Sequence, residues 1–109
     1  MGFRVTHLYG LTESYGPATL CAWQHGWDAL PMTERAQRMA RQGVPMPTLA
    51  ALQVADPQTA LPVMPRDGAT IGEVMLRGNT IMKGYLDNPA STDAAFAGGC
   101  NIVTERSNT

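Results

Sequence analysis

This chain of 109 residues has little of what marks several large protein classes. Its net charge is −1 and it has no block of like charges, so nothing in it attracts DNA, RNA or anionic lipid over a distance. No apolar run approaches the roughly 20 residues that cross a bilayer. Its two cysteines, Cys21 and Cys100, lie far apart, and no secretory signal is visible. These absences predict a cytoplasmic protein with free thiols, no nucleic-acid partner and no transmembrane segment.

What is present is a series of short apolar segments divided by turn residues, which suits one small domain or a piece of a larger one. Residues 3–9 are expected to form a strand that Gly10 breaks, and a polar turn segment follows over 10–17. Residues 18–27 are compatible with a short helix or a buried loop. Further extended segments, divided by turns, are expected at 49–55, 61–63, 70–77 and 80–82.

The clearest helix is expected over residues 33–42. Thr33 is placed to cap its start and Gly43 to end it. Glu34 and Arg38 lie four residues apart, where opposite charges on a helix attract each other. The apolar stripe of this segment is thin, so we expect a helix on the surface.

A second, shorter helix is expected near the end of the chain. Asn88 is placed as its cap and Pro89 as its first residue, with 90–97 following. The pair Gly98-Gly99 is expected to stop it.

The segment from Tyr9 to Glu13 carries the clearest chemical signal. An aromatic ring at Tyr9 closes the expected strand, Gly10 allows a tight turn, and a hydroxyl at Thr12 and a carboxylate at Glu13 follow. A loop at the end of a strand is where α/β proteins place ligands. The ring can lie against a planar base, the hydroxyl can donate to a phosphate oxygen, and the carboxylate can hold Mg²⁺. Alone, the five residues are also typical of an ordinary turn.

A second cluster lies about sixty residues downstream, from Gly72 to Pro89. Its glycines alone indicate the edge of a hairpin, which does not account for both clusters in this order. Together they resemble the adenylate-forming superfamily of acyl-CoA synthetases, luciferases and peptide-synthetase adenylation domains. That family has a tyrosine-glycine-x-threonine-glutamate motif, then a glycine-glutamate strand, an arginine-glycine pair and a methionine-x-glycine-tyrosine stretch. The resemblance covers residues 3–99.

The resemblance implies an α+β fold, a mixed, β-rich fragment of an acyl-CoA synthetase N-terminal domain. A strand-loop nucleotide site, a surface helix and part of a small β-barrel-like subdomain would make it up. The implied activity is that of an ATP-dependent acyl-CoA ligase. A carboxylate attacks the α-phosphorus of ATP to give an acyl-adenylate and pyrophosphate, and the thiol of coenzyme A then attacks the acyl carbonyl and releases AMP. The implied partners are a small carboxylic acid, ATP and coenzyme A, with Mg²⁺ as the metal.

The first cluster would supply the nucleotide site, again by resemblance. Tyr9, Gly10, Leu11 and Thr12 would bind the nucleotide, with the ring of Tyr9 near adenine and the hydroxyl of Thr12 on the α-phosphate. Glu13 would coordinate Mg²⁺. Thr12 and Glu13 would therefore be the catalytic residues, because the first step needs phosphate charge to be neutralised.

The stretch between the clusters is similar to the fatty-acyl-CoA synthetase branch. Tyr15-Gly16-Pro17, Trp23 and the run from Trp27 to Gly43 carry this similarity, which is strongest with medium-chain and methylthiopropionate-type CoA ligases. Gly16 and Pro17, with Gly10, would shape the pocket for a fatty or a short- to medium-chain carboxylate.

The chain departs from the family pattern at its end. The family continues beyond the glycine pair with a tryptophan-phenylalanine-histidine-threonine-glycine-aspartate stretch, whose aspartate holds the ribose hydroxyls. Residues 100–109 are polar, show no clear period and do not match it. We therefore expect a partial AMP-binding domain over 1–99 and an unrelated tail over 100–109, from a truncation or a frameshift.

The upstream phosphate loop and the C-terminal lid with its catalytic lysine are also missing from the sequence, and Lys83 stands in the wrong context to replace that lysine. The isolated chain is accordingly expected to be inactive. Two alternatives remain open at this point: a non-catalytic remnant, or a small module that binds nucleotide without turnover.

Overall fold

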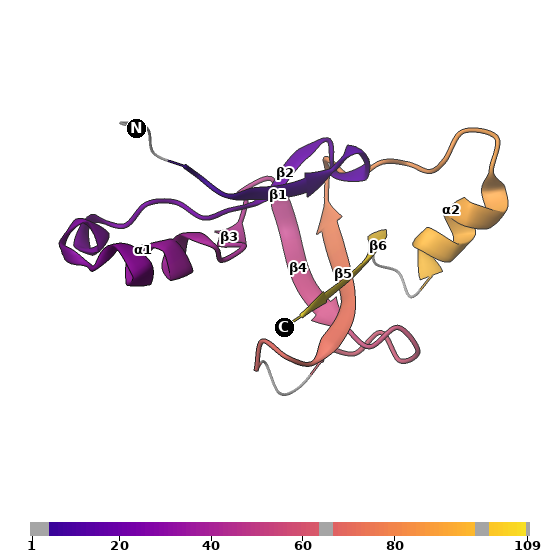
Figure 1. Ribbon diagram of the computed structural model, residues 1–109. Helices are drawn as coiled ribbons and strands as arrows, with labels where there is room; N and C mark the ends of the chain where they lie inside the picture. Colours follow the sequence, from indigo (N-terminus) through magenta and orange to yellow (C-terminus); the bar gives the residue numbers. More distant parts are fainter. Residues whose placement is uncertain (1–4, 64–66, 98–100, 109) are drawn as a thin grey trace.

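The computed structural model describes residues 5–63, 67–97 and 101–108, the last of these by backbone alone. Two three-stranded antiparallel sheets, ordered β1-β2-β3 and β4-β5-β6, lie between two helices at opposite ends of the molecule (Figure 1). This mixture confirms the α+β prediction. The elements in chain order are β1 (Leu8–Leu11), the 3₁₀ helix η1 (Thr12–Ser14), β2 (Gly16–Leu20), the 3₁₀ helix η2 (His25–Ala29), α1 (Met32–Met39), β3 (Val44–Pro45), β4 (Leu49–Ala55), β5 (Ile71–Gly78), α2 (Pro89–Ala95) and β6 (Asn101–Asn108).

Strand β1 of the first sheet begins later than the predicted strand and continues past Gly10. Strand β1 passes through Gly10, with a bulge between Tyr9 and Gly10, so the prediction that this glycine breaks the strand is wrong. A Cβ on Gly10 would lie 2.3 Å from the carbonyl oxygen of Gly16 on β2. Glycine stands here because β2 approaches closely, not because the chain turns. Residues 3 and 4 of the expected strand lie outside the described residues.

Strand β2 also corrects a prediction. Residues 18–20 belong to it, rather than to a helix or a buried loop, and only the 3₁₀ helix at 25–29 matches the helical alternative. Thr19 is paired on one side with Tyr9 and on the other with Pro45 of β3. Pairing partners on both sides, distant in sequence, make this segment a strand.

The second sheet agrees well with its apolar pattern. Strand β4 has the predicted limits, and β5 is shifted by one residue from the expected 70–77. Residues 61–63 return beside β4, since the amide of Val63 donates to the carbonyl of Val54 at 2.9 Å. The expected extended segment over 80–82 is not a strand.

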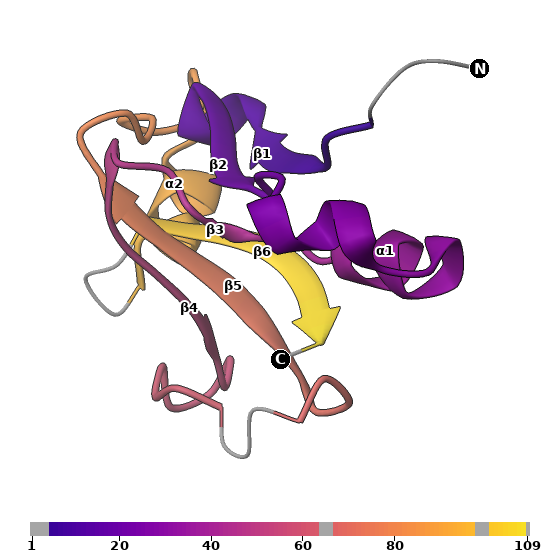
Figure 2. The same ribbon diagram turned by 90° about the vertical axis from the view of Figure 1, so that its left-hand side faces the viewer.

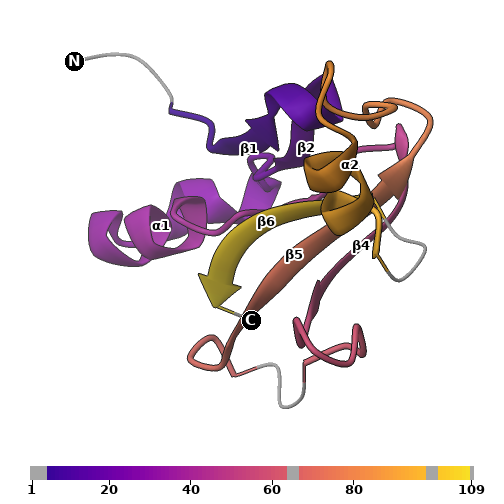
Figure 3. The ribbon, with the colours of Figure 1, turned by 90° about the vertical axis from the view of Figure 1, so that its right-hand side faces the viewer.

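The sequence analysis did not predict the last strand. Residues 101–108 form β6, which pairs with the outer edge of β5 (Figure 2). Backbone pairing along a free strand edge needs no apolar alternation in the added strand. Helix α2 lies against β6 (Figure 3).

The core lies where the two sheets meet. Ala18 of β2 and the β5 residues Val74 and Leu76 are buried together, and Leu76 is fully buried. Partly buried side chains surround them: Tyr9, Leu11, Leu49, Leu52, Val54 and Ile81. The ring of Tyr9 and the side chain of Leu11, both from β1, thus hold the candidate site against the second sheet.

Helix α1 is confirmed as a surface helix, because none of its residues is buried. Arg38 donates to the carboxylate of Glu34 at 2.7 Å, as the spacing predicts. The cap is different from the prediction: Pro31 precedes the helix, Thr33 lies inside it, and no side chain caps its start. Proline fixes its own φ near the helical value, so the chain can enter the helix one residue earlier.

Helix α2 is confirmed in place and in its capping. The side chain of Asn88 accepts a hydrogen bond from the amide of Ser91 at 3.0 Å, and Pro89 is the first helical residue. The helix ends at Ala95; the expected stop at Gly98-Gly99 lies outside the described residues. In the parts of the chain that the structure describes, neither helix has the length and apolar character to span a membrane.

Candidate functional site

The predicted site residues lie on the reversal from β1 through η1 to β2. Ser14, which the sequence did not single out, organises this turn and is buried. Its Oγ accepts from the amide of Leu11 at 3.0 Å and lies 2.9 Å from the Leu11 carbonyl and 2.8 Å from the Gly16 carbonyl, to which it can donate. Tyr15 then takes a left-handed conformation with φ of 55°, which completes the reversal. The turn is therefore built from its own short-range hydrogen bonds.

An open hollow of about 570 Å³ lies over this reversal. Six of the seven predicted site residues line it, together with Leu8. The lining residues are Leu8, Tyr9, Gly10, Leu11, Thr12, Gly16 and Pro17. Residues predicted for the nucleotide and residues predicted for the acyl group thus border the same space.

Two of these residues also serve the core. Tyr9 and Leu11 are partly buried and pack against the cluster around Leu76, while Thr12 is exposed. Tyr9 and Leu11 share one face of β1 because alternate side chains of a strand point to the same face, whereas Thr12 already belongs to η1. The stacking of the Tyr9 ring on adenine stays a prediction.

Glu13 does not line the hollow with the other six. The hydroxyl of Tyr85 donates to Oε1 of Glu13 at 3.1 Å, and the amide of Met82 donates to the Glu13 carbonyl at 2.8 Å. Partial desolvation raises the pKa of Tyr85, and the hydrogen bond and negative charge of Glu13 raise it further. The second sequence cluster therefore contacts the first directly, through a residue for which the sequence analysis predicted no role.

Comparison with protein families shows to which family the chain belongs. A model described as "AMP-binding enzyme" matches residues 1–86. The chain belongs to the AMP-binding enzyme family.

Curated members of this family with high similarity are CoA ligases. The chain is 52% identical over 98 residues to an acetate–CoA ligase of Humulus lupulus and 54% identical over 98 residues to a peroxisomal acetate/butyrate–CoA ligase of Arabidopsis thaliana. Each alignment covers 90% of this chain and 17% of the relative. The chain thus spans about a sixth of the length of these relatives.

A solved structure supports the fold. The chain superposes with a TM-score of 0.64 on a protein assigned as a long-chain-fatty-acid CoA ligase from Rhodopseudomonas palustris. The sequence identity is 28%, and the match covers 90% of this chain and 21% of that protein.

Members of the AMP-binding family are expected to use Mg²⁺ with ATP. The described residues suit the Mg²⁺ ion better than the triphosphate. They contain no group of three or more His, Cys, Asp or Glu side chains that could hold a metal. Mg²⁺ bound with a nucleotide needs only one or two carboxylates, since phosphate oxygens and water fill its other positions. The single carboxylate of Glu13, next to the Thr12 hydroxyl in sequence, suits this arrangement.

The hollow offers few contacts for the triphosphate of ATP. None of the residues that line the hollow is cationic. Transferring phosphoryl groups are normally held by positive side chains or by converging backbone N–H groups. The residues that line the hollow therefore supply no positive charge for a triphosphate.

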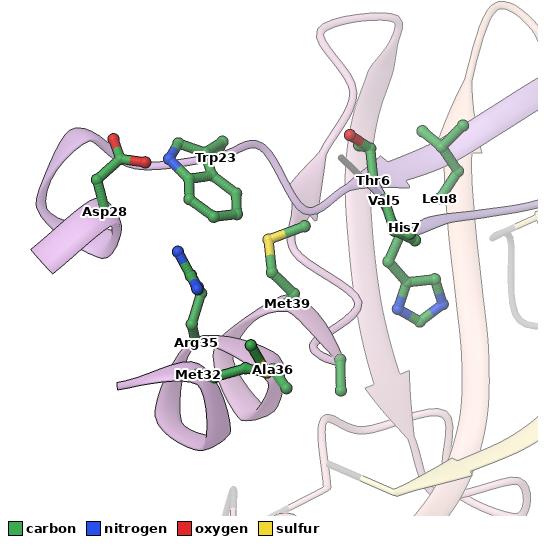
Figure 4. A pocket seen from close by; sticks show the side chains of 11 residues that line it. Val5, Thr6, His7, Leu8, Trp23, Asp28, Met32, Arg35, Ala36 and Met39 are labelled. Carbon is green, nitrogen blue, oxygen red and sulfur yellow. The ribbon is translucent and has the colours of Figure 1, made fainter. Parts of the chain in front are cut away.

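A larger hollow, about 970 Å³, lies elsewhere, between residues 5–8, Trp23 and α1 (Figure 4). Met32 and Met39 contribute apolar wall, and the guanidinium of Arg35 lies 5.9 Å from the centre of the Trp23 ring. It contains none of the seven predicted site residues, so its size does not make it the nucleotide site.

Proposed function

We propose that this chain supplies the strand-turn part of the Mg-ATP and acyl site of an acyl-CoA ligase. The observation that carries the proposal is the gathering of six motif residues around one hollow in a chain of the AMP-binding family. The reaction has two steps: a carboxylate oxygen attacks the α-phosphorus of ATP and pyrophosphate leaves, and the thiol of coenzyme A then attacks the acyl carbonyl and AMP leaves.

In the first step, residues of the turn bind and orient. The Thr12 hydroxyl donates to an α-phosphate oxygen, and Tyr9, Gly10 and Leu11 border the nucleotide. Glu13 would hold Mg²⁺, which when bound would neutralise phosphate charge. Hydrogen bonds to charged groups contribute about 1.5–3 kcal/mol each, so loss of Thr12 or Glu13 should weaken binding at least tenfold.

On the acyl side, Gly16 and Pro17 border the carboxylate together with Gly10. The names of two relatives specify acetate and butyrate, which supports a short-chain acid within the fatty-acid range that we propose. Gly16 and Pro17 are both exposed, so in the complete site they would face a pocket that other residues close.

The isolated chain, we propose, does not turn over substrate. Its hollow has no cationic lining residue, and the chain corresponds to 17% of the curated relatives. We further propose that residues 1–99 form the partial AMP-binding domain and 100–109 an unrelated tail, since the alignments with the two relatives span 98 of the 109 residues. A small module that binds nucleotide without turnover is the remaining alternative.

The proposal is tested by Mg-ATP binding to the purified chain, measured by isothermal titration calorimetry. Thr12→Ala and Glu13→Ala should each weaken binding at least tenfold, whereas Thr33→Ala on the exposed face of α1 should leave it unchanged. Equal affinities in all four proteins would refute the assignment of the site.

Turnover is tested separately with butyrate, coenzyme A and Mg-ATP. No butyryl-CoA above a blank without protein is expected, and clear product would overturn the proposed inactivity.

We propose a cytoplasmic location. The Arabidopsis relative is named as peroxisomal, so imaging of the tagged protein in its own cells would decide between the two compartments.

A further inference from the structure

A tyrosine of the second sequence cluster touches the carboxylate expected to hold Mg²⁺. The hydroxyl of Tyr85 donates to Oε1 of Glu13 at 3.1 Å across a separation of 72 residues. The structure shows no such donor on the other carboxylate oxygen of Glu13 among the described residues. One oxygen is thus occupied by a neutral donor, and the other can take a metal.

The backbone around Tyr85 is anchored on both sides of this contact. Its own amide donates to Oγ1 of Thr92 in α2 at 2.9 Å, and that hydroxyl donates to the carbonyl of Asn88 at 2.9 Å. Gly84 has φ of +155°, and a Cβ there would lie 2.7 Å from the Thr92 side chain.

The amide of Met82 donates to the Glu13 carbonyl at 2.8 Å, which ties the segment of Tyr85 to the η1 turn as well. The backbone of Tyr85 is therefore held by α2, and the segment that carries it is tied to the η1 turn through Met82. Tyr85 as a whole is 41% exposed, so burial alone does not explain why its hydroxyl meets Glu13.

We propose that Tyr85 is a positioning residue that fixes the Glu13 carboxylate and makes it bind Mg²⁺ through one oxygen. This inference rests on the proposed function. A carboxylate with one oxygen held by a donor loses rotational freedom and is disfavoured as a two-oxygen ligand. Mg²⁺ requires near-octahedral geometry, whereas Ca²⁺ accepts carboxylates through one or two oxygens. Tyr85 thus sets both the affinity for Mg²⁺ and the preference for Mg²⁺ over Ca²⁺.

The test compares ATP binding by calorimetry in saturating Mg²⁺ and in saturating Ca²⁺. Tyr85→Phe keeps the ring and removes the hydroxyl, and Tyr15→Phe is the matched control, since Tyr15 is 87% exposed. Partners of metal ligands typically change metal affinity by about 10–100-fold. We expect Tyr85→Phe to weaken Mg-ATP binding about tenfold and to weaken Ca-ATP binding much less, with Tyr15→Phe unchanged.

A double-substitution cycle assigns the effect to Glu13. In a Glu13→Ala background, Tyr85→Phe should have no further effect, because the two residues act as a pair. If Tyr85→Phe also lowers the melting temperature, the ratio of Mg²⁺ to Ca²⁺ affinity still separates the roles, since a loss of folding weakens both complexes alike.

The outcomes distinguish this inference from the proposed function. If the unsubstituted chain shows no cation-dependent ATP binding, the proposed site fails, and the role of Tyr85 fails with it. If that chain binds Mg-ATP, and Tyr85→Phe keeps both the affinity and the cation ratio, only the role of Tyr85 is refuted.

Discussion

Gly10→Ala should show whether the candidate site depends on the close approach of β1 and β2. An added Cβ would lie 2.3 Å from the Gly16 carbonyl oxygen, 2.8 Å from the Pro17 Cα and 2.9 Å from the Gly16 carbonyl carbon. Ordinary van der Waals contacts of a Cβ lie between 3.4 and 4 Å. All three neighbours are backbone atoms, which cannot rotate away as a side chain can. The two strands must therefore separate by roughly an ångström at the bulge.

The cost follows from two opposing effects. Forcing an extra carbon into a packed position costs typically about 1–3 kcal/mol, and rigid backbone neighbours favour the upper part of that range. Alanine restricts the unfolded chain more than glycine does, which returns about 0.4–1 kcal/mol. The net loss of stability should be about 2 kcal/mol, or roughly 10 °C in melting temperature for a domain of this size.

The assay is urea unfolding followed by the fluorescence of Trp23 and Trp27, neither of which lines the site hollow. Gly26→Ala is the matched control, because a Cβ there meets nothing within 4 Å and its φ is ordinary. That control should keep only the effect on the unfolded chain and raise the free energy of unfolding by about 0.4–1 kcal/mol. Equal unfolding midpoints for the two variants would refute the close approach of the strands. Mg-ATP affinity should also fall in Gly10→Ala and not in Gly26→Ala.

Two further predictions concern the core and a turn. Leu76→Ala should cost about 2–3 kcal/mol, in the lower part of the range for buried leucines, because half-buried neighbours can close on the cavity. Leu86→Ala, at a side chain 92% exposed, should cost less than about 0.5 kcal/mol; similar losses by chemical denaturation would contradict the core position of Leu76. The backbone N–H groups of Thr70 and then Ala69 lower the pKa of Asp67 from 3.8 to about 2. Because the folded pKa is depressed, this contribution to stability is complete above about pH 4 and is lost as the pH falls through about 2; a carboxyl midpoint near 3.8 by NMR would contradict it.

Local signals in the sequence were sufficient for several elements. Strand β4 and helix α2 were predicted closely, since an apolar run and an Asn-Pro start each act within a few residues. The Glu34–Arg38 pair was predicted for the same reason, because its spacing is fixed by the helix itself.

The predictions that were wrong or missing concern features that local sequence signals do not decide. Gly10 was expected to end a strand and instead lies inside one, because the deciding contact is with Gly16 on the neighbouring strand. Strand β6 has no apolar period and exists through pairing with β5. At the start of α1, Thr33 has the usual chemistry of a cap, but Pro31 already begins the turn.

The candidate site was likewise predicted in part and missed in part. The pentapeptide from Tyr9 to Glu13 is the basis of the chemistry that we propose, and six of the seven residues chosen from sequence border one hollow. The hydroxyl of Ser14, which shapes the turn, could have been noticed as a small polar residue between two glycines. The contact of Tyr85 with Glu13 had no local signal at all.

The sequence alone determined the family and the residue types of the site, because a ring, a glycine, a hydroxyl and a carboxylate in five positions are a local property of the chain. Only the tertiary structure decided which of these side chains share a space and which partner each one meets. Tyr9 packs on the core, Thr12 borders the hollow, and Glu13 turns to Tyr85. The physical reason is that strand pairing and side-chain hydrogen bonds join residues far apart in the chain, and the geometry of those contacts follows from the fold as a whole.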